Sequence, residues 1–214
     1  INLLPALPPI PHSVGGSLLM NYQTNNGLLG SSLNLFGNRN GLFFNVRLSQ
    51  KIAHSYQNAK DGYVYNSGFR ENDFDLQTGI NKAWGYVHLS ASTYASTIGM
   101  VEGIRDSTSG KFLKPIKLND STEGTALATN SDFKNYSSLI PYQKINHSKV
   151  VLSSNIVAGK GNIKALIGVQ QNFRREFSNV LLPNDVGLGF VLNTLNYDFR
   201  YIFPEYNGLD ISAG

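Results

Sequence analysis

The sequence contains no cysteine, so it has neither a disulfide framework nor a thiolate metal site. Charged residues make up only 15% of it, against roughly 25% in an average soluble protein. Lysine and arginine form no run, and the net charge of +4 is spread along the chain, so no nucleic acid partner is expected. No apolar stretch approaches the roughly 18–20 residues of a membrane helix. A membrane β-barrel is still allowed, because its strands need only about 9–11 residues.

Apolar and polar side chains alternate over stretches of about ten residues, which is the pattern of β-strands. The clearest stretch is 42–52, where Leu42, Phe44, Val46 and Leu48 alternate with Phe43, Asn45, Arg47 and Ser49. The same pattern predicts strands at 16–24, 28–36, 69–80, 85–98, 145–158, 162–175 and 190–203, and a ninth that begins near 208. No window of comparable length has the period of a long helix, and Pro115 favours a loop over 104–140.

The connections between these strands are of two kinds. Tight turns are expected at 25–27, 37–41, 81–85, 159–162 and 204–208, whereas 53–68, 99–144 and 174–189 form long polar loops. Short turns on one side and long loops on the other are typical of a β-meander that crosses a membrane. Charged residues at mid-strand, among them Arg47, Asp75 and Arg200, fit a polar barrel lumen. The sequence therefore predicts an all-β fold, an antiparallel transmembrane β-barrel meander that is partial, with about eight or nine strands of a larger barrel.

The two ends of the chain bear on its domain organisation. Pro5, Pro8, Pro9 and Pro11 keep 5–12 extended. We expect 1–15 to be a linker and 16–214 to be a partial β-barrel domain. The chain opens without a signal peptide and stops inside an expected strand, so we expect it to be a fragment of a longer protein.

Several segments resemble one family of membrane proteins. The run from GNRNG at 37 to HLS at 90, followed by GMVEGIRDSTSGKF at 99–112, resembles the amino-terminal half of the barrel of TonB-dependent outer-membrane receptors. The segments 138–177 and 188–214 resemble the strands that follow. The opening 1–18 resembles the exit from the plug domain into the first barrel strand.

The resemblance implies a barrel of about 22 strands that encloses a plug. It implies a receptor of the bacterial outer membrane that imports a scarce nutrient, such as a ferric chelate, by energy-coupled gated passage. The partners would be outer-membrane lipid, a small-molecule ligand and, through the missing plug, a TonB-type energy-coupling protein. The remaining barrel strands or another chain would pair with the edges of the sheet.

Two other functions fit the same pattern. One is a plug-less porin or adhesin-type barrel, and the other is a secreted soluble β-protein that binds glycans. An enzyme is not expected, because no serine stands in a nucleophile elbow and no helix follows Gly187-Leu188-Gly189 to make a phosphate loop. No cofactor is expected, and none of the histidines pairs with another at metal-ligand spacing.

The loop 53–68 is the strongest candidate for a binding site. Tyrosine offers a flat apolar ring and a polar tip at low entropic cost, which suits adaptable recognition. The predicted ligand-binding residues are His54, Tyr56, Tyr63, Tyr65 and Arg70. The simpler reading is an ordinary solvated loop. For the barrel lumen, we expect Asp73 and Asp75 to pair with Arg47 on the adjacent strand.

Overall fold

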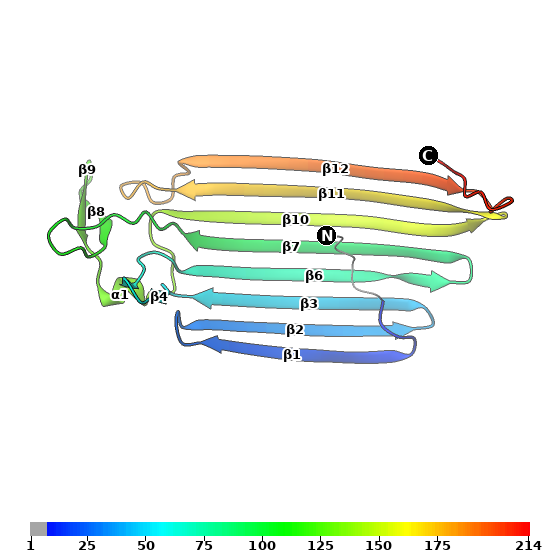
Figure 1. Ribbon diagram of the computed structural model, residues 1–214, viewed down its shortest axis with the longest axis horizontal. Helices are drawn as coiled ribbons and strands as arrows, with labels where there is room; N and C mark the ends of the chain where they lie inside the picture. The colour runs from blue at the N-terminus through cyan, green and yellow to red at the C-terminus, as the bar shows by residue number, and fades with distance from the viewer. Residues whose placement is uncertain (1–7) are drawn as a thin grey trace.

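The computed structural model describes residues 8–214, and the part of the predicted linker in 1–7 lies outside the described residues. Its main feature is a nine-stranded antiparallel sheet in which each strand lies beside its neighbours in the chain (Figure 1). The strands are β1 (Ser13–Gln23), β2 (Leu28–Arg39), β3 (Leu42–Ala53), β6 (Phe69–Lys82), β7 (Gly85–Gly99), β10 (Tyr142–Ala158), β11 (Gly161–Phe177), β12 (Leu188–Ile202) and β13 (Ser212–Ala213). The predicted all-β antiparallel meander is confirmed. Within residues 8–214 the sheet does not close into a barrel.

Five short elements lie in the connections between the strands. They are β4 (Gln57–Asn58), β5 (Gly62–Tyr63), β8 (Leu113–Asn119), β9 (Thr122–Leu127) and α1 (Asn130–Phe133). Those that Figure 1 labels, β4, β8, β9 and α1, lie at one end of the sheet. β4 pairs with β5 and β8 pairs with β9, so the connections predicted as polar loops contain hairpins of their own. No helix among the described residues is long and apolar enough to cross a membrane.

The opposite end of the sheet carries the tightest turns. Asn40 and Gly41 join β2 to β3 with φ angles of 54° and 82°, which is the geometry of a type I′ turn and matches the twist of the strands. A Cβ at residue 41 would lie 2.0 Å from the Asn81 carbonyl oxygen, so only glycine fits there. Two-residue turns also join β6 to β7 and β10 to β11. Most connections are sorted by length as predicted, with one short turn, 24–27, on the side of the long loops. The prediction that a tight turn at 204–208 joins the last two strands is wrong, because the connection from β12 to β13 covers 203–211 and the ninth strand begins at Ser212.

The strand register gives the sheet two different faces. Phe44 lies opposite Thr78 and Val46 opposite Leu76, whereas Arg47 lies opposite Asp75. We call the side of Val46 the apolar face and the side of Arg47 the polar face. The alternation along the strands assigns nine apolar residues to a lipid side, and all of them lie on the apolar face: Leu42, Phe44, Val46, Leu48, Leu76, Ile80, Leu89, Leu195 and Phe199. The alternation assigns five polar residues to a lumen side, and these lie on the polar face: Asn45, Arg47, Asp73, Asp75 and Arg200.

No described residue covers the apolar face. Met20 is 77% exposed, Leu195 63% and Leu48 50%. Few apolar side chains of the sheet are buried, and the only cluster of buried residues lies in the loops, within residues 8–214. Strand edges are also open. β1 pairs only with β2, and β12 pairs with β13 over two residues alone.

The predicted ion pairs on the polar face do not form as expected. Arg47 faces Asp75 across the ladder, but no ion pair within 4.0 Å joins Arg47 to Asp73 or Asp75. The ion pair between β3 and β6 lies further towards the loops, where Lys51 Nζ is 3.2 Å from Glu71 Oε2. Correct register places opposite charges on facing strands, but side-chain entropy and solvation decide whether they meet.

Candidate functional site

The long connections 54–68 and 100–141 fold together into one unit, which we call the loop cap. Its core consists of Val64, Tyr65 and Phe112, which are 4%, 7% and 5% exposed. Ala128, Phe133 and Leu139 pack against these three residues. The backbone joins the two connections as well, because Ser55 N donates to Phe133 O at 3.0 Å. Apolar burial of this kind gives the loops a fixed shape.

Aromatic rings extend this core towards the rim of the sheet. Tyr63 stacks on Phe133 with ring centroids 5.5 Å apart, and His54 makes edge contacts with Tyr63 and Tyr136 at 5.9 and 5.4 Å. The Tyr136 hydroxyl donates to Gly27 O at 2.7 Å. The turn 24–27 is thereby tied to the loop cap.

A single asparagine holds both ends of the 100–141 connection. Asn66 is 4% exposed. Its Nδ2 donates to Met100 O at 3.2 Å and to Pro141 O at 2.6 Å, and its Oδ1 accepts from Leu139 N at 3.2 Å. It has a φ of 59°, in the left-handed region that asparagine tolerates. We call this arrangement the Asn66 clamp; sequence reasoning did not identify it.

Two ion pairs fix the outer parts of the loop cap. Lys114 Nζ lies 2.7 and 2.8 Å from the two carboxylate oxygens of Asp132. Arg105 Nη2 lies 2.8 Å from Asp61 Oδ1, and its guanidinium carbon is 3.9 Å from the centroid of the Phe112 ring. The Arg105 contact combines charge pairing with a cation–π interaction.

Asp132 has a further role at the start of α1. Its carboxylate accepts hydrogen bonds from the backbone N and the hydroxyl of Thr129, at 2.8 and 2.7 Å. Burial by itself would raise the pKa of Asp132, but the hydrogen bonds from Lys114 and Thr129 outweigh burial and hold that pKa below its ordinary value. The carboxylate is therefore a charged fixture of the cap.

A pocket of about 380 Å³ lies where all three long connections meet. Tyr65, Lys114 and Asp132 line it from the loop cap, Tyr142 from the start of β10, and Pro183 from the connection 178–187. Burial raises the pKa of Tyr65 to about 12, with Asp132 and Glu102 adding to the rise, so the phenol is a neutral group at physiological pH. Aromatic and proline walls with a single ion pair can hold a small, largely apolar or chelated molecule.

The structure brings together only some of the predicted binding residues. His54, Tyr63 and Tyr65 lie in one aromatic cluster of the loop cap, and Tyr65 also lines the pocket. Tyr56 is 42% exposed at the outer surface. Arg70 lies apart from them on the apolar face of β6, opposite Ile52 and Thr97. The pocket also contains Lys114, Asp132 and Tyr142, which the sequence did not predict as binding residues. They come from separate parts of the chain, and only the fold brings them together.

The polar face carries a second, larger hollow. It measures about 710 Å³ and lies halfway along the strands. Its charged and aromatic lining residues are Arg47, Asp75, Tyr86 and Lys149. Within the described residues, no group of three or more His, Cys, Asp or Glu side chains could hold a metal ion.

Comparisons with known proteins identify no relative. No protein-family model, no curated protein and no solved structure matches this chain.

Proposed function

We propose that this chain is part of a transmembrane β-barrel of the bacterial outer membrane, the amino-terminal half of the barrel of a TonB-dependent receptor. Such a receptor takes up a scarce nutrient, a ferric chelate or a similar small ligand, by energy-coupled passage. Further strands close the barrel at the open edges of β1 and β12, and a plug carries the contact with the energy-coupling protein.

The observation that carries the proposal is the separation of charge between the two faces. Every acidic residue of the nine strands belongs to the polar face, within residues 8–214: Glu71, Asp73, Asp75, Glu176 and Asp198. The apolar face is exposed from β1 to β12, with Leu18 68% and Tyr197 72% exposed. A soluble protein would cover a surface of this extent, because exposed apolar patches above a few hundred Å² mark an interface. Hydrocarbon is the partner that fits a sheet of this width.

The loop cap favours the function of a receptor rather than that of an open diffusion pore. A diffusion porin needs no folded unit at the mouth, whereas recognition needs side chains held in place by a rigid scaffold. The pocket between Tyr65, Lys114 and Tyr142 is the proposed outer site for the ligand. His54 and Tyr63 support this site by packing, because Tyr63 contacts His54 and stacks on Phe133, which contacts Tyr65. Tyr56 offers an exposed ring on the same connection as Tyr63.

Cysteine labelling of the full-length receptor in cells tests the membrane part of the proposal. We expect Asn45→Cys, on the polar face, to react with a charged maleimide, and Phe44→Cys, on the apolar face, to be shielded by lipid. The two positions are neighbours, so each serves as the control for the other. Reaction of both cysteines with the charged reagent would reject the barrel and favour a soluble β-protein.

Uptake measurements test the ligand part. Lys114→Gln removes the cation that lines the pocket, whereas Lys117→Gln removes a similar cation whose partner Asp120 lies at the surface. We expect the first variant to lower the uptake of labelled ferric chelates by about tenfold, the size of one lost charged hydrogen bond, and the second to leave uptake unchanged. Equal uptake by both variants would show that this pocket is not the ligand site.

A further inference from the structure

The few charged side chains on the apolar face are all basic and lie at the strand ends. Among the described residues of the nine strands they are Arg39 and Lys82 at the end with the tight turns, and Arg70, Lys144 and Arg175 at the end with the loops. Charges of both signs occur on the polar face, so the absence of acids from the apolar face is a property of that surface.

The three cations at the loop end share one line across the sheet, which we call the basic row. Arg70 lies opposite Thr97, Thr97 opposite Lys144, and Lys144 opposite Arg175. Neighbouring strands are about 4.8 Å apart, so the backbone positions of the row span only about 15 Å. No acidic side chain belongs to the apolar face of the four strands that carry it.

None of these three cations forms an ion pair with a described residue, although neighbours on the polar face do. Lys144 Nζ lies 5.6 and 5.2 Å from the ring centroids of Tyr142 and Phe177, which stack on each other. Arg175 Nη2 donates to Asn146 Oδ1 at 3.2 Å. Lys144 and Arg175 are therefore positioned by uncharged groups, and no described acidic side chain lies within ion-pair distance of the row.

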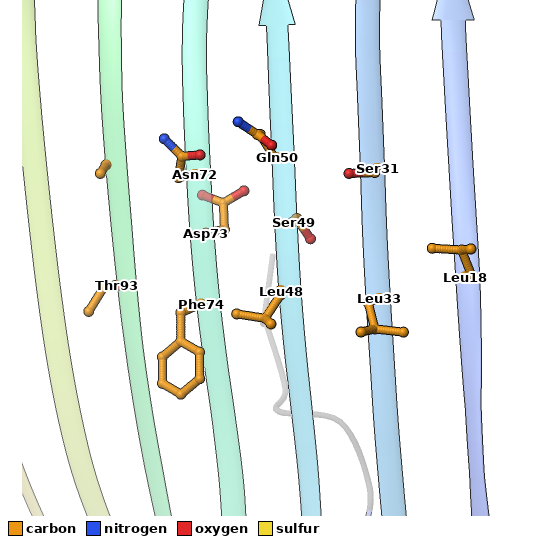
Figure 2. Close-up of a pocket in the computed structure, with 11 residues that line it drawn as sticks. Leu18, Ser31, Leu33, Leu48, Ser49, Gln50, Asn72, Asp73, Phe74 and Thr93 are labelled. Atoms are coloured by element: carbon orange, nitrogen blue, oxygen red, sulfur yellow. The ribbon is translucent and has the colours of Figure 1, made fainter.

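Below Arg70, at one end of the basic row, the surface changes from charged to polar to apolar. Gln50, Asn72 and Ser31 form a polar notch on the apolar face (Figure 2). The pair of Asn72 and Gln50 lies next to the pair of Arg70 and Ile52 on that face. Leu33, Leu48 and Phe74 lie directly below the notch, and these groups help to line a hollow of about 430 Å³. Ser49 and Asp73 also line this hollow, although the register assigns both to the polar face. Cation, uncharged polar group and hydrocarbon follow each other down the face. A lipid has the complementary order of phosphate, polar linkage and acyl chain.

We propose that the basic row binds the phosphate groups of an anionic lipid whose acyl chains lie on the apolar face. The inference rests on the proposed membrane location, because only there does this face meet lipid. Arginine and lysine are suited to phosphate oxygens, and a charge-assisted hydrogen bond at the edge of the hydrocarbon is stronger than one in water. Without a phosphate, the same side chains would only extend towards the aqueous phase.

Lipid titration of the full-length receptor tests the inference. The probes are lipid A with its phosphates and the same glycolipid after phosphate removal, added to delipidated protein in a neutral detergent and counted by native mass spectrometry. We expect Arg70→Gln/Lys144→Gln/Arg175→Gln to weaken binding of the phosphorylated probe at least about tenfold. The matched control is Lys51→Gln/Arg174→Gln, which removes cations at a similar distance from the loop end of the strands, but on the polar face. It should change binding less than about twofold.

Three results would overturn the inference. They are equal binding of both probes, unchanged binding by the triple variant, and displacement of the lipid by inorganic phosphate at similar concentration, which would indicate a site for free anions. Should the triple variant lose the heat-modifiable mobility of a folded barrel, Arg175→Gln alone gives the same comparison. The cysteine labelling at positions 44 and 45 decides membrane location separately. If the receptor labels as expected but the triple variant still binds lipid A, the lipid inference fails and the proposed function stands.

Discussion

The sheet and the loop cap place their large apolar side chains in opposite ways. The cap buries Val64, Tyr65 and Phe112 inside itself, as a water-soluble unit does. The sheet turns its large apolar side chains outward, with Met20 77% and Leu195 63% exposed. One chain thus contains a region with its apolar side chains inside and a region with many of them outside, which is the arrangement that the proposed membrane location requires. The boundary between them is the rim where the strands meet the loops, and each region should fail in its own way.

The largest expected effect comes from the core of the loop cap. Phe112→Ala removes a buried ring and should lower the stability of the cap by about 3–5 kcal/mol. Because the ring packs only within the loop cap, the proposed barrel should keep its heat-modifiable mobility while 100–141 becomes sensitive to protease. Simultaneous loss of both would mean that the two regions fold as one unit.

A charge placed in the sheet should have the next largest effect. Leu76→Arg puts a cation at mid-strand on the apolar face. If that face meets lipid as proposed, the variant should cost roughly 2–4 kcal/mol on insertion, measured by folding titration into bilayers. Gln77→Arg changes the neighbouring residue on the polar face, beside Arg47 and Asp75, and should cost much less. Similar costs for the two variants would remove the distinction between the faces.

The loop cap should also respond to alkaline pH. Tyr65 has a pKa of about 12 in the folded cap against an ordinary value of 10.0, so the fold favours the neutral phenol. The contribution is complete below pH 10 and is lost as pH rises through the range from 10 to 12. The difference in phenolate absorbance between the native protein and Tyr65→Phe should have its midpoint near 12, and Tyr65→Phe should reduce the unfolding of the cap in that range. A midpoint near 10 would contradict the burial of this hydroxyl.

The smallest effect is expected for the ion pair of the polar face. Lys51 and Glu71 side chains are 52% and 21% exposed, so solvent screens the pair. A double-mutant cycle with Lys51→Gln and Glu71→Gln should give a coupling of less than about 1 kcal/mol. A larger coupling would show that water is excluded from the polar face around Lys51 and Glu71.

The strands were predictable because their signals are local. Alternation placed β3 at 42–52 where the structure has Leu42–Ala53, and β12 at 190–203 where it has Leu188–Ile202. Turn residues with positive φ, such as Asn40 and Gly41, mark the hairpins in the sequence itself. A period of two also separates the faces without any knowledge of the partner strand.

The loop cap was not predictable in the same way. Its hairpins are short and depend on contacts between 54–68 and 100–141, so propensity alone gives them no signal. Tyr65 was expected to meet a ligand, but it lies in the core and only lines the pocket. Phe112 and Phe133 were the available clue, since aromatic residues in a polar loop often indicate a local core. Arg47 and Asp75 show a further limit, because register predicts proximity and leaves side-chain geometry undetermined.

The Asn66 clamp has a consequence for the order of folding. Every other strand of the meander meets its neighbour across a much shorter connection, so hairpins form one after another with low contact order. The 100–141 connection interrupts that series, and closing it costs entropy that grows with its length. By holding Met100, Leu139 and Pro141 at one point, Asn66 stabilises the pairing of β7 with β10 once the connection has closed. Because the entropy of closure grows only slowly with length, insertions in 100–141 should slow the folding of the sheet only slightly, whereas loss of the Asn66 amide should mainly speed the opening of the closed connection.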